Sequence, residues 1–194
     1  MNTPVEIRRK VRQNLSDLSP HERQQLIENA ISRFVRTRAF RNSKHIACYF
    51  PVRHELDIIP LIEYCWSCKK KVYLPCLSPR PFNHLYFLPF SRDTKLSLNR
   101  FRIPEPDHTL KKRVHVHKLD IVVTPLLAFD QNGARLGMGG GFYDRTFAFK
   151  RYSKHLNKPK LWSIALEIQH YSLTPMPWDV YLDGIVTESS IYHS

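Results

Sequence analysis

The sequence predicts an α/β protein, a three-layer αβα sandwich with a mostly parallel, Rossmann-like central sheet. Short apolar runs of strand character alternate with longer segments whose apolar residues recur at helical spacing. The run Ile121-Val122-Val123 is apolar at consecutive positions, as expected of a central strand that is covered on both faces. The length of 194 residues suits one core, so we expect residues 1–194 to form a single domain.

The first helix with a clear start signal begins after Ser19. Ser19 is a capping residue, Pro20 suits the first helical position, and Glu22 stands three residues after the cap. Residues 26–35 then carry an apolar stripe beneath a basic and polar face. We expect this helix to pack against the sheet.

The remaining elements follow from apolar runs and their boundaries. A helix is expected over residues 58–69, with Asp57 as its cap. Strands are expected over residues 45–50, 71–75, 85–88, 120–124, 161–166 and 184–187. Because ligands of such sheets bind beyond the carboxyl ends of the strands, the loop after Thr124 is the expected position of the chemistry.

The composition restricts the class of protein. Thirty Lys and Arg against 17 Asp and Glu give a formal charge of +13, which favours an anionic partner. The four cysteines are expected to be reduced thiols, and no apolar run reaches the length of a membrane span. We therefore expect a cytoplasmic protein with no membrane association.

A glycine-rich loop is the strongest functional signal. Four of the six glycines lie in residues 137–141, where backbone amides can approach an anion closely. Arg135 and Arg145 flank this loop, and Asp144 supplies a carboxylate of the kind that Mg²⁺ uses beside phosphates. The pattern is neither a Walker A sequence nor a dinucleotide fingerprint, so a purely structural glycine turn stays the alternative.

Residues 125–145, which contain this loop, closely resemble the signature of the 5-formyltetrahydrofolate cyclo-ligases, also called methenyltetrahydrofolate synthetases. Further blocks of resemblance cover the basic N-terminal helix and residues 49–57, 102–106 and 177–188. The resemblance implies an enzyme that uses ATP and Mg²⁺ to convert 5-formyltetrahydrofolate to 5,10-methenyltetrahydrofolate. In that family ATP phosphorylates the formyl oxygen, N10 of the folate closes the ring, and ADP and phosphate are released.

The resemblance also implies roles for individual residues. The expected ATP-binding residues are Arg8, Arg12, Arg135, Leu136, Gly137, Met138, Gly139, Gly140, Gly141, Phe142 and Tyr143. The expected folate-binding residues are Phe50, Glu55, Phe101 and Tyr143, and the expected metal ligands are Asp144 and Asp179. Where family members often carry a Lys, this chain has Pro4, so Arg9, Lys10 or Arg12 is expected to replace it.

The expected partners are therefore ATP and 5-formyltetrahydrofolate, with or without a polyglutamate tail, and the expected state is a monomer that binds no nucleic acid. Alternatives remain at two site residues. Glu55 precedes a helix and can serve as a capping acid, and Asp179 can be a loop cap, in which case Asp183 competes for the metal.

Three other patterns are weaker. Cys65 and Cys68 have redox or zinc spacing but lie inside a predicted helix, and His115 and His117 lack a third ligand nearby in the sequence. Basic runs at residues 8–12, 69–71 and 111–113 occur without a recognisable nucleic-acid module. The rival function is a non-catalytic basic module on the same fold that binds nucleotide or RNA.

Overall fold

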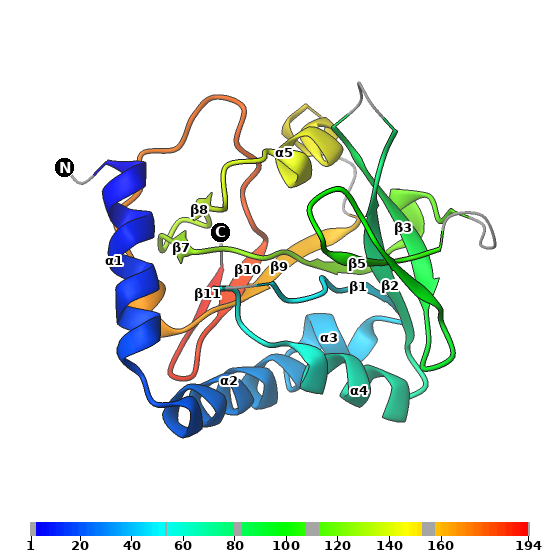
Figure 1. Cartoon of the computed structure of the whole chain (residues 1–194), viewed down its shortest axis with the longest axis horizontal. Coiled ribbons are helices and arrows are strands. Elements are labelled where there is room, and N and C mark those ends of the chain that lie inside the picture. The colour runs from blue at the N-terminus through cyan, green and yellow to red at the C-terminus, as the bar shows by residue number, and fades with distance from the viewer. Residues whose placement is uncertain (1–2, 53, 80–82, 108–112, 153–157, 194) are drawn as a thin grey trace.

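A mixed sheet of seven strands forms the centre of the molecule (Figure 1). The computed structural model describes residues 3–52, 54–79, 83–107, 113–152 and 158–193. The strand order is β11-β10-β9-β6-β1-β2-β3, with β10 to β2 parallel and both edge strands antiparallel to their neighbours. The strands are β1 His45–Ala47, β2 Lys71–Leu77, β3 Leu85–Phe90, β6 Ile121–Val123, β9 Lys160–Ile164, β10 Gly184–Val186 and β11 Ile191–His193. The predicted α/β class and mostly parallel sheet are confirmed.

Two small hairpin-like pairs stand apart from this sheet. One joins β4 Leu96–Leu98 to β5 Pro104–Pro106, and the other joins β7 Ala128–Phe129 to β8 Arg135–Leu136. The sequence did not indicate either pair, because two or three residues are too few to show a period. The second pair matters most for function, since β8 leads directly into the glycine-rich loop.

One face of the sheet is covered by helices. They are α2 Pro20–Val35, α3 Arg38–Asn42 and α4 Ile59–Ser67, while α1 Pro4–Asp17 stands beside them and contacts β7 (Figure 1). The Ser19 hydroxyl accepts from the Glu22 amide and the Glu22 carboxylate accepts from the Ser19 amide, so the predicted capping box is confirmed. Apolar residues of α1, α2 and α4 share one core cluster with β1, β2, β6, β9 and β10.

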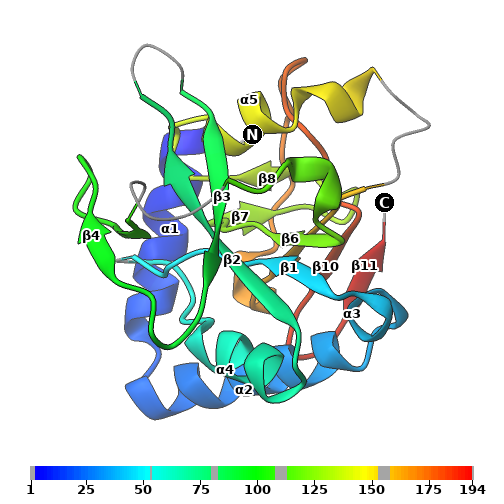
Figure 2. The same ribbon diagram turned by 90° about the vertical axis from the view of Figure 1, so that its right-hand side faces the viewer.

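The other face has a thinner cover. It consists of the short helix α5 Phe142–Thr146, the 3-10 helix η2 Ala148–Arg151 and loop segments, which pack around the fully buried Phe147. Two further 3-10 helices are η1 Val116–Lys118 and η3 Glu167–Gln169. The three layers are therefore present, but one of them is built mainly from loops and single helical turns (Figure 2).

The order of the strands creates a crevice between β1 and β6. The chain moves from β1 through α4 to β2 in one direction and from β6 through α5 to β9 in the other. Ligands of such sheets bind where the strand order reverses, beyond the carboxyl ends of the strands. The segment 48–55 follows β1 and the segment 124–141 follows β6, so the fold brings Glu55 and the glycine-rich loop to the same edge.

Several predicted boundaries were too long. The strand expected over residues 45–50 ends at Ala47, and the helix expected over 58–69 is α4, whose first amide, that of Ile59, donates to Asp57 Oδ1 at 2.9 Å. Lys69 adopts a left-handed φ of 56°, which ends the helix. Within the described residues no helix is both long enough and apolar enough to span a membrane.

Candidate active site

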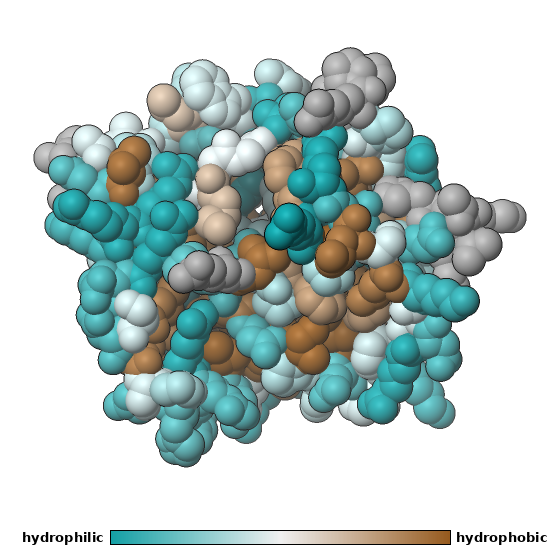
Figure 3. All heavy atoms as spheres, in the orientation of Figure 1, coloured by the Kyte–Doolittle hydropathy of each residue, from teal (hydrophilic) through white to brown (hydrophobic). Residues whose placement is uncertain are grey.

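The glycine-rich loop, residues 137–141, runs from the end of β8 to the start of α5. Gly139 has φ 99° and Gly141, the residue that caps α5, has φ 63°. Side chains rarely adopt such values, so at these two positions glycine is required by the backbone. Figure 3 shows that the surface is hollowed beside this segment, between α1 and α5.

Two arginines of helix α1 contact the loop. Arg8 Nε donates to the Gly137 carbonyl at 2.9 Å, and Arg12 Nη2 lies 3.8 Å from Met138 Sδ. Arg12 Nε is buried and has no hydrogen-bond partner within the described part of the chain. The loop and α1 are far apart in sequence, and only the fold brings these predicted ATP-binding residues together.

Arg135 is buried and bonded to the protein, whereas an arginine that binds phosphate is expected to have a free guanidinium. Its side chain is 6% exposed, pairs with Asp144 Oδ1 at 2.7 Å and donates to the Val180 carbonyl at 2.6 Å. Burial lowers the pKa of Arg135, whereas the negative charges of Asp144 and Asp179 raise it. Asp144 Oδ1 also accepts from the Val180 amide at 3.1 Å, so the ion pair anchors the segment before β10.

Arg145 clamps the loop from its other side. Its Nη2 donates to the Gly140 carbonyl and its Nε to the Asn83 carbonyl, the latter at 3.1 Å. The guanidinium also lies over the Phe142 ring, 5.5 Å from its centroid. Both flanking arginines are therefore engaged with the protein, and α1 adds Arg8 at the Gly137 carbonyl and Arg12 at the Met138 sulfur.

Glu55 and Tyr143 are partly buried neighbours at this edge of the sheet, where the charge of Glu55 acts on Tyr143. Burial raises the pKa of Glu55 to about 7, although the Val52 amide, which donates to Oε2 at 3.1 Å, opposes the shift. Burial also raises the pKa of Tyr143, and the neighbouring Glu55 charge adds to this effect. Perturbed ionisable groups of this kind concentrate at functional sites.

Tyr49 belongs to the same group, although the sequence did not single it out. Burial raises its pKa, and the charges of Glu55 and Tyr143 act in the same direction. Its hydroxyl donates to the Leu56 carbonyl at 3.0 Å, which ties the segment after β1 to α4. A tyrosine in an apolar run reads as core, so the sequence held no signal for this position.

The two predicted aromatic residues of the folate site lie differently. Phe101 is 54% exposed on the turn between β4 and β5 and meets the Phe142 ring edge to face at 5.8 Å. Asn99 Oδ1 accepts from the amides of Phe101 and Ile103, which orders this turn. Phe50 is partly buried and packs against the core cluster.

The two predicted metal ligands lie close to Arg135. Asp144 is paired with it, and the charge of Asp179 acts on it. Asp179 Oδ2 accepts from the Met176 amide at 2.8 Å, the loop-capping role that was the alternative. The competing Asp183 is occupied by Lys150 at 3.2 Å and Lys160 at 2.9 Å.

Within the described residues no group of three His, Cys, Asp or Glu side chains is placed to hold a metal ion. Mg²⁺ in phosphate-transfer sites uses one or two carboxylates and completes its shell with phosphate oxygens and water. Asp144 and Asp179 both lie near the positive charge of Arg135, and the number of these carboxylates fits such a site. The donor set does not fit a metal held by protein atoms alone.

The weaker sequence patterns do not form sites. Cys65 is buried and Cys68 exposed, and all four cysteines are free thiols. The His115 and His117 rings stack at 4.9 Å, but the described residues supply no third ligand. Of the basic run 111–113, Lys111 and Lys112 lie outside the described residues.

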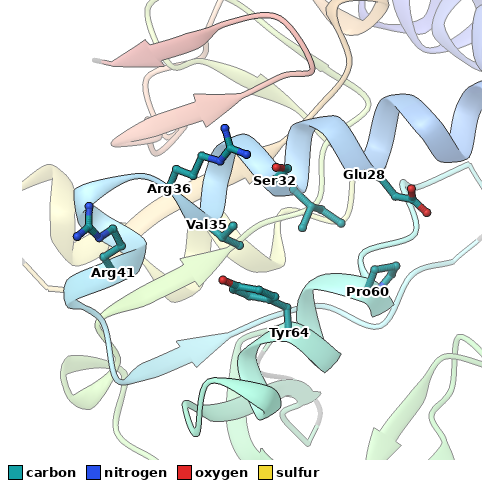
Figure 4. Close-up of a pocket in the computed structure, with 8 residues that line it drawn as sticks. Glu28, Ser32, Val35, Arg36, Arg41, Pro60 and Tyr64 are labelled. Carbon is teal, nitrogen blue, oxygen red and sulfur yellow. The ribbon is translucent and has the colours of Figure 1, made fainter.

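A separate groove of about 600 Å³ lies on the helical face, between α2 and α4. Figure 4 shows Val35 and Tyr64 facing each other across it, with Glu28 toward one end and Arg41 at the other. It does not include any residue of the loop, nor Glu55 or Tyr143. The candidate active site is therefore defined by its buried ionisable groups and its backbone conformation, not by the volume of a groove.

The chain is similar to known proteins of one kind. The family model described as the 5-formyltetrahydrofolate cyclo-ligase family matches residues 1–188. The 5-formyltetrahydrofolate cyclo-ligase of Escherichia coli (strain K12) is 34% identical over 183 residues, which are 94% of this chain and 98% of that protein. The protein of the same name from Haemophilus influenzae is 41% identical over 138 residues, 71% of this chain and 72% of that protein.

A solved structure agrees with the sequence relatives. The NMR structure of Aquifex aeolicus 5,10-methenyltetrahydrofolate synthetase superposes with a TM-score of 0.79 at 31% identity and covers 98% of this chain and 92% of that chain. A 5,10-methenyltetrahydrofolate synthetase from Mycoplasma pneumoniae has a TM-score of 0.72 at 21% identity and supports the fold alone. Because the family matches nearly all of the sequence, the chain belongs to the 5-formyltetrahydrofolate cyclo-ligase family.

Proposed function

We propose that this enzyme converts 5-formyltetrahydrofolate to 5,10-methenyltetrahydrofolate with hydrolysis of ATP to ADP and phosphate, and that it requires Mg²⁺. The observation that carries the proposal is the meeting of three features at one sheet edge: the glycine-rich loop, the arginines of α1, and the partly buried residues Glu55 and Tyr143. An anion cradle beside partly buried polar side chains suits a polyphosphate next to a substrate with a polar ring system.

ATP is assigned to the loop and α1. Positive φ angles at Gly139 and Gly141 let the backbone approach phosphate oxygens without a side chain in the way. Arg8 is already directed at the loop, and Arg12 carries a buried Nε that lacks a partner within the described residues. A phosphate oxygen would satisfy that donor, so Arg12 is our candidate to replace the Lys that Pro4 displaces.

Mg²⁺ would be held by Asp144 and Asp179, where it neutralises charge on the transferring phosphate. Arg135 keeps Asp144 oriented through Oδ1. Asp179 is fixed by the Met176 amide. Both carboxylates are thus positioned by the protein before any ligand binds.

The folate is assigned to Glu55, Tyr143, Phe50 and Phe101. With its pKa raised to about 7, Glu55 exists in both protonation states near neutrality and can exchange hydrogen bonds with the polar edge of a pteridine. The exposed Phe101 ring is available to stack on an aromatic part of the substrate. The formyl oxygen would then face the loop that holds the γ-phosphate.

This arrangement suits the chemistry of the proposed reaction. The formyl oxygen attacks the γ-phosphorus and ADP departs; N10 then attacks the formyl carbon and loses its proton, and phosphate leaves with the formyl oxygen as the ring closes. Phosphoryl transfer to a weak nucleophile depends on positioning and charge neutralisation more than on a covalent side chain. Glu55 and Tyr143, both partly buried at this edge of the sheet, would orient the folate for both steps.

The test is an absorbance assay. Purified protein is mixed with 5-formyltetrahydrofolate, Mg²⁺ and ATP at mildly acidic pH, and the near-ultraviolet absorbance of the methenyl product is followed. We expect a rise that needs ATP and stops when Mg²⁺ is chelated. Binding of ATP without any such rise would instead favour the rival, a non-catalytic nucleotide- or RNA-binding module.

We further propose that the enzyme acts as a cytoplasmic monomer and accepts folates with or without a polyglutamate tail. The formal charge of +13 supports the second point, because it attracts polycarboxylates as well as nucleotides. Sedimentation of the purified protein tests the first point, and a comparison of KM for mono- and polyglutamylated substrate tests the second.

A further inference from the structure

The segment of residues 171–183, which we call the strap, connects η3 to β10 and runs from α1 to α5. At its start the Tyr171 hydroxyl accepts from Asn14 of α1 at 3.2 Å, and at its end the Leu182 amide donates to the Gly133 carbonyl at 2.9 Å. Figures 1 and 2 both show it, in orange, beside α5. The strap is therefore a neighbour of the glycine-rich loop, which is contacted by Arg8 of α1 and leads into α5.

The middle of the strap is held in one conformation. The Asp179 amide donates to the Met176 carbonyl at 3.0 Å, and the Met176 amide donates to Asp179 Oδ2 at 2.8 Å, which closes a tight turn. Arg151 Nη1 donates to the Pro177 carbonyl at 3.1 Å. Val180, directly after the turn, is bound by both Arg135 and Asp144.

Trp178 sits within this turn and exposes 57% of its surface. The other two tryptophans are less exposed: Trp162 is 4% exposed, and Trp66 is partly buried and donates its indole N–H to the Phe90 carbonyl. Met176 and Tyr181 of the strap are also exposed. Three exposed large apolar side chains on one anchored segment are more than the single ones that a surface ordinarily carries, and groups of this kind mark ligand-binding surfaces.

The position of the strap within the site indicates which of the two proposed ligands, ATP or folate, lies beside Trp178. The strap begins at α1, the helix whose Arg8 and Arg12 reach the loop, whereas Phe101 lies on the turn between β4 and β5. In Figures 1 and 2 the strap and the β4–β5 pair lie on different sides of α5. The ligand beside the strap is thus the one whose phosphates meet α1.

We propose that Trp178 stacks on the purine base of ATP and is a nucleotide-binding residue of this enzyme. The inference rests on the proposed function only for the identity of the nucleotide. The indole supplies a flat face that any purine can cover, and the anchored turn keeps that face in place before binding, so little ordering is needed. The same Asp144 and Arg135 that serve the phosphate end fix the base end through Val180.

The experiment is a binding titration that needs no turnover. ADP and inorganic tripolyphosphate are titrated separately into the unmodified protein while tryptophan emission is recorded; in Trp178→Ala and Trp178→Phe, which lack this reporter, calorimetry is used. We expect ADP to quench the unmodified protein and to bind Trp178→Ala roughly 5- to 100-fold more weakly, with partial recovery in Trp178→Phe. Tripolyphosphate, which has no base, is expected to bind all three proteins equally.

Tyr64→Ala is the matched control, because Tyr64 is an exposed aromatic residue on α4 outside the site. It is expected to bind ADP as the unmodified protein does. Equal ADP affinity in Trp178→Ala and the unmodified protein would overturn the proposal, as would an equal loss of tripolyphosphate affinity, which would mean that the turn has collapsed. A failure of catalysis with base-dependent ADP binding intact would count against the proposed function and leave the stacking role standing.

Discussion

The glycine-rich loop and the groove between α2 and α4 are two regions of the molecule that are built in opposite ways. At the loop, glycines adopt positive φ and the ionisable side chains of Arg135, Glu55 and Tyr143 are withdrawn from water. In the groove, Glu28 and Arg41 are exposed at the rim of an apolar floor. The groove has a volume of about 600 Å³, but the loop region has the ionisable side chains whose pKa values the fold has shifted.

The difference teaches that burial of charge marks the working region of this molecule. An exposed charge costs the fold little and gains little from its neighbours. A buried one must be compensated, as Arg135 is by Asp144, and that compensation fixes the geometry of the site. Substitutions in the two regions should therefore have unequal consequences, which the following experiments measure from the largest effect to the smallest.

Asp144→Ala is expected to have the largest effect, because it removes a proposed metal ligand and leaves Arg135 buried without its partner. We expect kcat to fall by roughly 100- to 1000-fold and the free energy of unfolding to fall by about 3 kcal/mol. Asp144→Asn keeps an acceptor for the Val180 amide and should recover part of the stability but not the turnover. Glu28→Gln in the groove is the carboxylate control, and near-normal activity of Asp144→Ala at limiting Mg²⁺ would remove Asp144 from the metal site.

Glu55→Gln is expected to change how stability depends on pH. The pKa of Glu55 is raised from 4.5 to about 7 in the folded protein, so the folded state binds more protons than the unfolded state between these values. Its contribution is fully present below pH 4.5 and is lost as pH rises through 7, by about 3 kcal/mol in all. Glu55→Gln should remove this loss and be the more stable protein at pH 8.

Denaturant titrations of both proteins from pH 4 to pH 8 measure the difference. Glu63→Gln, at an exposed position of α4, is the control and should run parallel to the unmodified protein. If the curves for Glu55→Gln and the unmodified protein also stay parallel, Glu55 is not buried as described.

Gly139→Ala tests whether backbone conformation matters at the loop. A side chain at φ 99° costs about 1–3 kcal/mol. We expect the loop of the variant to relax to another conformation that ATP binding must reverse, so that KM for ATP rises roughly 5- to 100-fold while the thermal midpoint moves little. Gly184→Ala is the contrasting variant, because its Cβ would come within 2.6 Å of the Trp162 ring in the core. It should lower the thermal midpoint and leave kcat per folded molecule unchanged; the reverse pattern would refute the distinction.

Substitutions in the groove should have the smallest effects. Tyr64→Ala and Arg36→Ala remove exposed groups outside the proposed site, so kcat and the KM values are expected to change by less than about twofold. Steady-state assays at matched protein concentration check this. A tenfold change in KM for either substrate would mean that the groove takes part in binding.

The elements that the sequence predicted well are those with local signals. The α2 start was found because Ser19, Pro20 and Glu22 interact within one turn, and the central strand because three consecutive β-branched residues stand together. The β7–β8 pair was missed because its few contacts join residues 128–129 to 135–136 with no periodic pattern. Short pairs of this kind are set by the surrounding structure rather than by their own residues.

The site shows the same division. The glycine-rich loop was visible as a composition, and the family resemblance supplied Arg8, Glu55 and Phe101, which remain predictions as binding residues. The pairing of Arg135 with Asp144 was not predictable, because it depends on which way β8 turns its side chains. The same holds for the pKa of Glu55, which is a consequence of burial that only the assembled fold produces.

Amide hydrogen exchange with and without an ATP analogue tests the central claim most directly. If the loop is the nucleotide site, exchange should slow at residues 137–144 and along the face of α1 that carries Arg8 and Arg12. The segments that line the groove, residues 28–41 and 60–64, should exchange at unchanged rates. Protection confined to the groove, with the loop unaffected, would contradict the account.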